Sequence, residues 1–412
     1  MNDETRVNET VMEQEEVVTR PEVNDRLLKI AVIGTGNCGS MLANDACESL
    51  GLDGIAINGS ERDLKLVSCP RVITFKTGDG KGTGKDRDTA KNFFFEDSGL
   101  VVDKKFVNTI ESNDVIIVAT STGGGYGSGS STELLELLIK MYPSKVFIAA
   151  GVLPFQSEQY SAFEGTKSWL KELSNLNVGY LLYDNNQYSG VTPNKAAKLV
   201  NENFVRDIKV FQGDFIGRTF TGGIDERDML TVLSVPGRII ADSIEGLEPS
   251  NVKNGSIIQT LSEHIQTKSA HAEMVTDKVI DASAMMYTLG EEFDEFKGSI
   301  KDDLQTQFGA HIKDATNFSD EEDVNSVAVV LTGLSAPNMV IDRVINKAKI
   351  LGDDINKRKA SQSKLFKDDD ESAVKTIVAK RSFADETPMV KADETVSKEE
   401  LLKNFLNSKH RK

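Results

Sequence analysis

Six short apolar runs, rich in β-branched residues, recur through the first half of the chain. Each run is nearly continuous, which is typical of strands buried on both faces of a parallel sheet. Amphipathic helical patterns follow several of them, for example from residue 41 and over residues 133–139. This alternation predicts an α/β fold with a Rossmann-like parallel sheet. The runs occupy residues 27–33, 54–58, 72–75, 114–118, 146–153 and 178–183.

A different pattern begins at Pro193, a residue that suits the first turn of a helix. Apolar residues then repeat at spacings of three and four, which predicts a long helix with one apolar face. They are Ala197, Val200, Phe204, Ile208, Phe211 and Phe215. Helices and strands alternate beyond it, with the clearest strands at 279–287 and 327–334 and an amphipathic helix at 293–308. The pattern predicts a second, smaller α/β domain, followed by a long, charged C-terminal helix.

Both ends of the chain are polar and lack a sustained apolar period, so we expect them to be flexible. The tail ends in an apolar stretch at 401–406 and basic residues at 409–412. Together they form a short segment that could bind another surface. The expected boundaries are an acidic arm at 1–26, a first domain at 27–192, a long helix at 193–220, a second domain at 221–335, a C-terminal helix at 336–365 and a flexible tail at 366–412.

Composition narrows the possible functions. The net charge of −16 argues against broad nucleic-acid binding by the body of the protein. The three cysteines form no C-x-x-C pair, which argues against a disulfide framework and a structural zinc site. The four histidines are scattered and predict neither a metal cluster nor a catalytic triad. No apolar run approaches a membrane span, and Met1 opens no signal peptide, so we expect a cytoplasmic protein without a membrane partner.

The most informative stretch is residues 119–131, ATSTGGGYGSGSS, which lies between an apolar strand and a helical pattern. Strand, glycine loop and helix together form an anion cradle, because glycines let several backbone N–H groups point at one phosphate. The loop lacks the lysine of G-x-x-x-x-G-K-[ST], so it is not a Walker A loop. The alternative is a glycine-rich linker, although a linker rarely joins a buried strand to an amphipathic helix.

A second glycine motif, G-x-G-x-x-G, occupies residues 34–39 after the first strand. On its own it predicts a Rossmann dinucleotide site, and therefore an NAD(P)-dependent oxidoreductase. The next strand should then end in an acidic residue that binds the ribose, but it ends in Asn58, Gly59 and Ser60. The glycine loop at 123–129 also has no place in that scheme.

The sequence GGGYGSG at 123–129 closely resembles the tubulin/FtsZ signature GGGTGSG. The resemblance implies a GTPase domain over residues 27–192 and a central helix that joins it to the second domain. It implies GTP and Mg²⁺ as cofactors. One departure is Tyr126, which stands where the family usually has threonine. By resemblance, the GTP contacts fall on Gly34, Gly36, Asn37, Cys38, Gly39, Asn58, Gly123, Gly124, Gly125, Tyr126, Gly127, Ser128, Glu158, Asn185 and Asn201.

Several of these assignments have alternatives. Asp63 accompanies Asn58 in the loop after the second strand, and Glu164 is the second candidate for the ribose contact given to Glu158. The glycine-rich loop at 77–88 corresponds to the family's loop over the terminal phosphate, so Lys81 and Lys85 are candidates to neutralise phosphate charge. Ordinary solvated positions are the alternative for both lysines.

The catalytic candidates are Asp225 and Asp228, in a segment that resembles the FtsZ synergy loop N-x-D-x-x-D. The resemblance implies that they orient the attacking water in the site of a neighbouring subunit. Gly223 replaces the usual asparagine of that loop. The alternative is that both acids simply favour a helix N-terminus.

A strand, the motif G-L-x-x-P at 333–337 and a long terminal helix resemble the plasmid and phage tubulins of the TubZ and PhuZ type. The resemblance covers residues 27–360. It implies filaments of identical subunits that hydrolyse GTP at their interface and segregate or position plasmid or phage DNA, with the tail binding a DNA-binding adaptor, a viral or plasmid cargo, or the neighbouring subunit. A filament protein with little hydrolysis is the main alternative.

Overall fold

The computed structural model of the chain describes residues 26–188, 190–213, 223–273, 279–319, 325–363 and 397–410. The predicted N-terminal arm therefore lies outside the described residues, apart from Arg26, as does most of the predicted tail. Phe215, the last apolar residue assigned to the long helix, also lies outside them.

All six strands predicted in the first half are confirmed, and they form a parallel sheet in the order β3-β2-β1-β4-β5-β6. This order places β1 and β4, each followed by a glycine motif, side by side in the middle of the sheet. A doubly wound sheet binds its ligands beyond the carboxyl ends of its strands. The strands are β1 (Ile30–Thr35), β2 (Asp53–Asn58), β3 (Val72–Lys76), β4 (Val115–Ser121), β5 (Val146–Leu153) and β6 (Gly179–Asp184).

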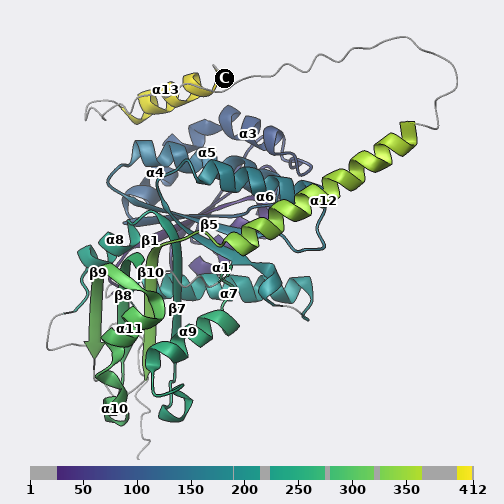
Figure 1. Cartoon of the computed structure of the whole chain (residues 1–412). Helices are drawn as coiled ribbons and strands as arrows, with labels where there is room; N and C mark the ends of the chain where they lie inside the picture. Colours follow the sequence, from purple (N-terminus) through teal and green to yellow (C-terminus); the bar gives the residue numbers. More distant parts are fainter. Residues whose placement is uncertain are drawn as a thin grey trace, which may run out of the picture.

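Helices cover both faces of this sheet (Figure 1). One apolar core lies between the strands and α1 (Gly36–Leu50) and α7 (Pro193–Phe211). The other lies beneath α3 (Arg87–Glu96), α4 (Lys104–Glu111), α5 (Tyr126–Met141) and α6 (Tyr160–Leu173). Short elements complete this half: α2 (Glu61–Leu64), η2 (Ser98–Val102) and η3 (Asn185–Gln187).

The second half continues the same sheet. The first strand beyond α7, β7 (Gly237–Glu245), pairs with β6 at two residues, Gly179 with Gly237 and Tyr180 with Arg238. The order is then β7-β10-β8-β9, in which β10 (Ser326–Leu334) is antiparallel to both neighbours and β8 (Val279–Thr288) is parallel to β9 (Ala310–Ser319). The two predicted domains thus share one ten-stranded sheet.

The helices of the second half are α8 (Glu226–Leu233), η4 (Pro249–Asn251), α9 (Ile257–Lys268), η5 (Glu291–Phe293), α10 (Asp294–Lys297) and α11 (Ile300–Phe308). The single helix predicted over 293–308 is interrupted between α10 and α11, at Gly298 and Ser299. Glycine and serine both favour a break over helix continuation. The predicted long terminal helix is confirmed as α12 (Asn338–Ser363), which packs across α6.

Near the C-terminus, the prediction of a flexible tail is wrong for residues 398–410. They form α13 (Lys398–His410), which lies against α5 and η2 of the first domain (Figure 1). Leu402 and Phe405 are buried in that contact. The apolar segment that looked adhesive in the sequence therefore finds an apolar partner on its own chain.

Candidate functional site

A cavity of about 420 Å³ opens at the carboxyl ends of β1, β2 and β4. It collects residues from both glycine motifs, from the loop after β2 and from the loop before α3. Its lining consists of Thr35, Gly36, Asn37, Cys38, Asn58, Ser60, Asp63, Lys81, Gly82, Thr83, Gly84, Lys85, Ser121, Gly124, Gly125, Tyr126 and Gly127.

Two helix N-termini open into this cavity. Helix α1 begins at Gly36 behind the N-cap residue Thr35, and α5 begins at Tyr126 behind Gly125. The Thr35 side chain makes no capping bond, and Gly125 has no side chain to make one. The first N–H groups of a helix lack intrahelical partners and carry partial positive charge, so an uncapped N-terminus favours an anion. Two of them at one cavity suit a ligand with several phosphates.

Glycine is required where the two loops touch. Gly36 has a φ of +68°, and a Cβ on it would lie 2.8 Å from the backbone nitrogen of Gly127. A Cβ on Gly127 would lie 2.3 Å from Thr120 Oγ1 and 2.6 Å from the Thr35 carbonyl oxygen. Side chains at these positions would force the two loops apart.

The signature 123–129 divides between loop and helix. Gly123 and Gly124 belong to the loop, whereas Gly127 and Ser128 lie in the first turn of α5. The Ser128 hydroxyl donates to the Gly124 carbonyl and closes this turn. The loop that the sequence predicted over 119–131 is therefore shorter, because β4 extends to Ser121 and α5 begins at Tyr126.

Tyr126 directs its ring into the protein. Its exposed fraction is 5%, and the ring lies beside Gly59 and in the same core as Phe93. Burial raises the pKa of its hydroxyl above the ordinary value. Tyr126 still supplies the first backbone N–H of α5, as a threonine would. Its phenol ring packs in the core.

The glycine-rich loop before α3 forms one wall of the cavity. Gly78, Gly80, Gly82 and Gly84 all have positive φ, as does Lys85. Backbone bonds tie the loop to the end of β2, from Gly82 N–H to the Gly59 carbonyl and from Glu61 N–H to the Gly80 carbonyl. Lys81 and Lys85 both line the cavity, but the Lys81 side chain is 84% exposed and its ammonium lies 3.6 Å from Asp79, as in an ordinary solvated position.

Most of the predicted ligand residues come together here, including Asn37, Cys38, Asn58 and Asp63. Asn58 donates to Asp63 at 3.4 Å and accepts from the Ser60 N–H at 3.2 Å. Gly34 and Gly39 lie just behind the cavity, where a Cβ on Gly34 would be 2.1 Å from the Gly39 carbonyl oxygen.

Glu158 lies at the edge of the site and does not line the cavity. Its carboxylate is 4.0 Å from Lys85 Nζ. Burial, with a contribution from Glu158, raises the pKa of the Cys38 thiol to about 12. Both contacts place Glu158 beside the two loops. Glu164, the second candidate, pairs instead with Lys167 on α6.

Gly123, Ser128, Asn185 and Asn201 also lie outside the cavity lining. Asn185 is buried and donates to the Leu153 carbonyl at 2.9 Å. Asn201, on α7, donates to Asp45 on α1 at 2.7 Å. Sequence reasoning in turn missed hydroxyl residues of the lining, among them Thr35 and Ser121. Their only signal is their position at the last residue of β1 and β4, where parallel strands present side chains to a ligand.

The catalytic candidates lie at the other end of the sheet. Asp225 is the N-cap of α8, where it accepts from Asp228 N–H at 2.8 Å and donates its own N–H to Asp228 Oδ2 at 3.1 Å. Both acids are exposed. This reciprocal pair is a capping box. It agrees with the alternative from the sequence, in which both acids favour a helix N-terminus.

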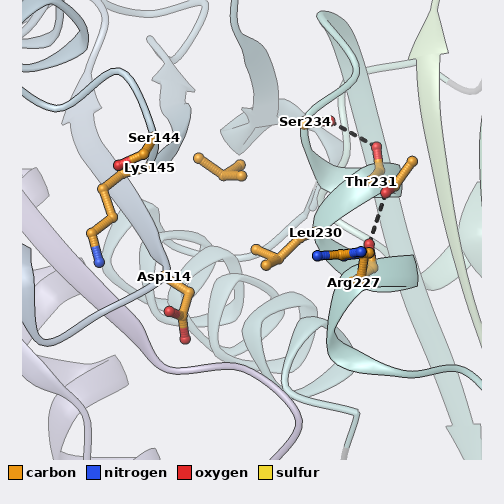
Figure 2. Close-up of a pocket in the computed structure, with 8 residues that line it drawn as sticks. Asp114, Ser144, Lys145, Arg227, Leu230, Thr231 and Ser234 are labelled. Carbon is orange, nitrogen blue, oxygen red and sulfur yellow. Dashed lines mark hydrogen bonds between the residues drawn. The ribbon is translucent and has the colours of Figure 1, made fainter. Parts of the chain in front are cut away.

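A second cavity, of about 320 Å³, separates α8 from the amino ends of β4 and β5 (Figure 2). It is lined by Arg227, Leu230, Thr231 and Ser234 on one side and by Asp114 and residues 144–146 on the other. Asp114 precedes β4, and Ser121, the last residue of β4, lines the first cavity. The two cavities are thus separated by the seven-residue length of β4, roughly 23 Å.

Within the described ranges there is no cluster of three or more metal-ligating side chains, and no helix there has the length and apolar character needed to cross a membrane. Asp63 is the one carboxylate in the lining of the first cavity.

Residues 29–193 match the Tubulin/FtsZ family, GTPase domain. The tubulin-like protein CetZ of Thermococcus kodakarensis is 27% identical over 239 residues, which cover 55% of this chain and 61% of that protein. Cell division protein FtsZ 1 of Pyrococcus horikoshii is 24% identical over 217 residues, which cover 50% of this chain and 57% of that protein. The chain thus spans about three-fifths of the length of these curated relatives.

Solved structures share the fold over most of the chain. TubZ of Clostridium botulinum phage c-st superposes with a TM-score of 0.63 at 17% identity, covering 80% of this chain and 99% of that one. CetZ2 of Haloferax volcanii, described as a GTPγS-bound protofilament, gives a TM-score of 0.63 at 17% identity, with coverage of 80% and 100%. These matches identify residues 29–193 as a GTPase domain of the Tubulin/FtsZ family, and most of the chain shares its fold with TubZ and CetZ2.

Proposed function

We propose that this protein binds GTP in the cavity at the carboxyl ends of β1, β2 and β4. The observation that carries the proposal is the meeting of two uncapped helix N-termini, α1 and α5, at one cavity. Their free N–H groups are suited to the phosphates, and Lys81 and Lys85 add positive charge on the facing wall. Glu158 is the candidate for the ribose hydroxyls, and Asn185 and Asn201 are the candidates for the guanine edge.

Mg²⁺ would be held mainly by the phosphates of the nucleotide, because Asp63 is the one carboxylate in the lining. Magnesium commonly binds nucleotide sites through one or two carboxylates, phosphate oxygens and water. In such a site the ion would neutralise charge on the terminal phosphates. Asp63, which already accepts from Asn58, could accept a further hydrogen bond from a water bound to the ion.

Hydrolysis, in this proposal, takes place between two subunits. Asp225 and Asp228 are separated from their own cavity by the length of β4, which is too far for a carboxylate to orient water there. A neighbour stacked along the sheet direction would bring its α8 end to this cavity. Both acids are exposed at that end, where they are free to meet such a neighbour. The protofilament described for CetZ2 of H. volcanii supports a longitudinal contact of this kind.

The filaments are proposed to segregate or position plasmid or phage DNA. Support comes from the fold shared with TubZ of phage c-st and from the G-L-x-x-P motif before α12. A DNA-binding adaptor or a cargo would bind the C-terminal tail.

A second candidate is a filament protein that binds GTP with little hydrolysis. The capping box favours it, because Asp225 and Asp228 each use one carboxylate oxygen to satisfy the other's backbone N–H. In that case both acids stabilise α8 and need no catalytic role.

Nucleotide selectivity and concentration dependence test these functions. Thermal unfolding is measured with GTP, ATP and NAD; we expect stabilisation by GTP alone, and stabilisation by NAD alone would indicate an oxidoreductase. Phosphate release per subunit is then measured against protein concentration alongside pelleting. A cooperative rise of both supports hydrolysis at the interface, whereas pelleting without phosphate release supports the second candidate.

A further inference from the structure

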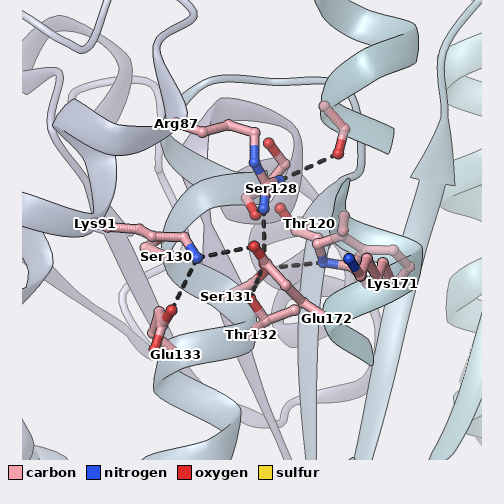
Figure 3. A network of polar contacts seen from close by, with 12 residues as sticks. Arg87, Lys91, Thr120, Ser128, Ser130, Ser131, Thr132, Glu133, Lys171 and Glu172 are labelled. Atoms are coloured by element: carbon pink, nitrogen blue, oxygen red, sulfur yellow. Dashed lines mark hydrogen bonds and ion pairs between the residues drawn. The ribbon is translucent and has the colours of Figure 1, made fainter. Parts of the chain in front are cut away.

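A network of charged side chains joins three helices above the GTPase sheet (Figure 3). Arg87 on α3 pairs with Glu172 on α6 at 2.7 Å. Lys91, one turn later on α3, bridges Glu172 at 2.8 Å and Glu133 of α5 at 2.9 Å. Thr132 donates to Glu172 at 2.7 Å. The network is largely sheltered from water, since the side chains of Arg87 and Glu133 are 14% and 10% exposed.

One end of this network reaches the nucleotide cavity. Arg87 donates to the Ser128 carbonyl, in the first turn of α5, at 2.5 Å and to the Gly165 carbonyl of α6 at 3.2 Å. Arg87 also follows the glycine-rich loop directly and lies two residues after Lys85, which lines the cavity. Its guanidinium therefore fixes the end of that loop against the helix that carries the signature glycines.

The other end of the network is completed by α13. Lys409 lies 2.7 Å from Glu133 and 2.8 Å from Glu136. Phe405, 4% exposed, anchors the helix beside it, and Lys140 and Lys409 both lie over the Phe405 ring. Glu133 thus divides its two carboxylate oxygens between Lys91 and Lys409.

Charge balance in the network depends on α13. Burial alone would lower the pKa of Lys91, but its bonds to Glu172 and Glu133 raise that pKa overall, and the same opposition raises the pKa of Lys409. Without Lys409, the buried carboxylate of Glu133 would draw Lys91 toward itself and away from Glu172. Lys91 fixes Glu172 Oε1, whereas Arg87 bonds to Oε2 of the same carboxylate. Without Lys91 the carboxylate could turn, and the Arg87 guanidinium would lose its fixed orientation.

We propose that docking of α13 on α5 holds Arg87 in place through Glu133, Lys91 and Glu172, and thereby raises the affinity of the cavity for nucleotide. Arg87, Lys91 and Lys409 act as positioning residues in this arrangement. The inference rests on the proposed function in naming the ligand, whereas the coupling between α13 and the glycine-rich loop can be measured without any nucleotide. Linkage requires the reverse effect as well, so bound GTP strengthens the docking of α13.

The test compares two substitutions at opposite ends of α13 in the full chain. Lys409→Gln removes the link to Glu133. Lys398→Gln is the matched control, because Lys398 pairs with Glu111 and lies over the Tyr142 ring, outside the network. The two variants lose the same charge from the same helix, and circular dichroism with thermal unfolding confirms that each is folded.

Hydrogen exchange of residues 79–88 is measured first, without nucleotide. We expect faster exchange in Lys409→Gln than in the wild type, with Lys398→Gln close to the wild type. GTP titration should then show about fivefold weaker binding for Lys409→Gln alone, at the lower end of typical coupling between sites. Added GTP should slow exchange in residues 398–410 of the wild type.

Equal loop exchange in Lys409→Gln, Lys398→Gln and wild type would overturn the coupling, whatever the nucleotide affinities. Equally faster loop exchange, or equally weaker GTP binding, in both variants would show that α13 acts through its docking alone and would also overturn the network. If the wild type binds no GTP while the loop exchange still differs, the proposed function fails and the coupling stands.

Discussion

Glycines of the two loops serve different purposes, although the sequence presents them as one kind of motif. Gly36 and Gly127 allow the loops to touch, since a Cβ on either would lie within 2.8 Å of a backbone or hydroxyl atom of the other segment or of β4. Gly124 has open space: a Cβ there would meet nothing closer than Ser121 at 3.8 Å. The residue also lines the cavity, so its lack of a side chain leaves room for a ligand.

Because of this difference, we expect Gly124→Val to impair GTP binding without destabilising the fold. We expect its unfolding free energy to stay within about 0.5 kcal/mol of the wild type, as at sites without packing conflict. GTP affinity should fall more than about tenfold, because the added side chain enters the cavity that the phosphates are proposed to occupy. Urea unfolding and GTP titration measure the two effects. Gly127→Val is the control and should be strongly destabilised, and undiminished GTP affinity in Gly124→Val would contradict the assignment of the loop.

Tyr126 gives the second prediction at this scale. Tyr126→Thr would restore the residue usual in the family, but it would also remove a buried ring. We expect a loss of about 3–5 kcal/mol in unfolding free energy, typical of replacing a buried aromatic side chain by a small one. Tyr126→Phe, which keeps the ring, is the control and should remain near the wild type. Equal stability of Tyr126→Thr and wild type in urea unfolding would show that the ring is not part of the core.

The sequence predicted the positions of single residues best where the backbone alone decides them. The two glycine motifs, for which we propose phosphate binding, meet at one cavity because glycine permits close backbone contact whatever packs around it. The direction of the Tyr126 ring depends on where α5 begins, and the sequence did not define that start. The side-chain amides of Asn185 and Asn201 likewise donate to Leu153 and Asp45, and no local sequence pattern predicts these partners.

Among the elements, α13 shows why the C-terminal prediction was wrong. Its apolar residues are few and stand among lysines and glutamates, so the segment has no core of its own. Its helix is stabilised instead by distant residues, Glu111 on α4 and Glu133 and Glu136 on α5. The strands of the sheet were predictable because a short, continuous apolar run is typical of a strand that is buried on both faces.

A buried ionisable group lies where α7, β6 and β7 meet. Asp207 on α7 accepts from the Tyr183 hydroxyl of β6 and lies 3.2 Å from His271 Nε2. His271 Nε2 is also 2.9 Å from the Ala241 carbonyl of β7. Burial alone would lower the pKa of His271, but Asp207 raises it above 6.5 overall, and burial raises the pKa of Asp207.

These shifts predict how stability depends on pH. Both groups have raised pKa values in the folded state, so the folded chain binds more protons than the unfolded chain. The stabilisation from His271 is complete below pH 6.5 and is lost as the pH rises through its higher folded value, with a slope of at most about 1.4 kcal/mol per pH unit. Urea unfolding between pH 6 and 9 should show this decline in the wild type and a flatter profile in His271→Gln. Parallel profiles would contradict the shift.

For the whole molecule, the decisive fact is that β4 ends at one cavity and begins at the other. Ser121 and Asp114 mark these ends, and α8 lies at the second. The sequence predicted which residues are candidates for catalysis, but their separation from the phosphate loops follows only from strand direction. A single chain therefore cannot place Asp225 beside its own first cavity, and the hydrolysis that we propose would need a second subunit.

Mixing two inactive variants tests this arrangement. In the first, Asp225→Asn with Asp228→Asn removes both charges while the amide oxygens still accept the capping bonds, which an alanine would lose at about 1 kcal/mol. The second is Gly124→Val, with intact acids and a blocked cavity. Alone, each should release phosphate about a hundredfold more slowly than the wild type, since the water is unoriented or the nucleotide absent. Mixed, a nucleotide-filled cavity of the first meets the acids of the second, and phosphate release should recover. Co-pelleting without recovery would show that Asp225 and Asp228 cap α8 and take no part in hydrolysis.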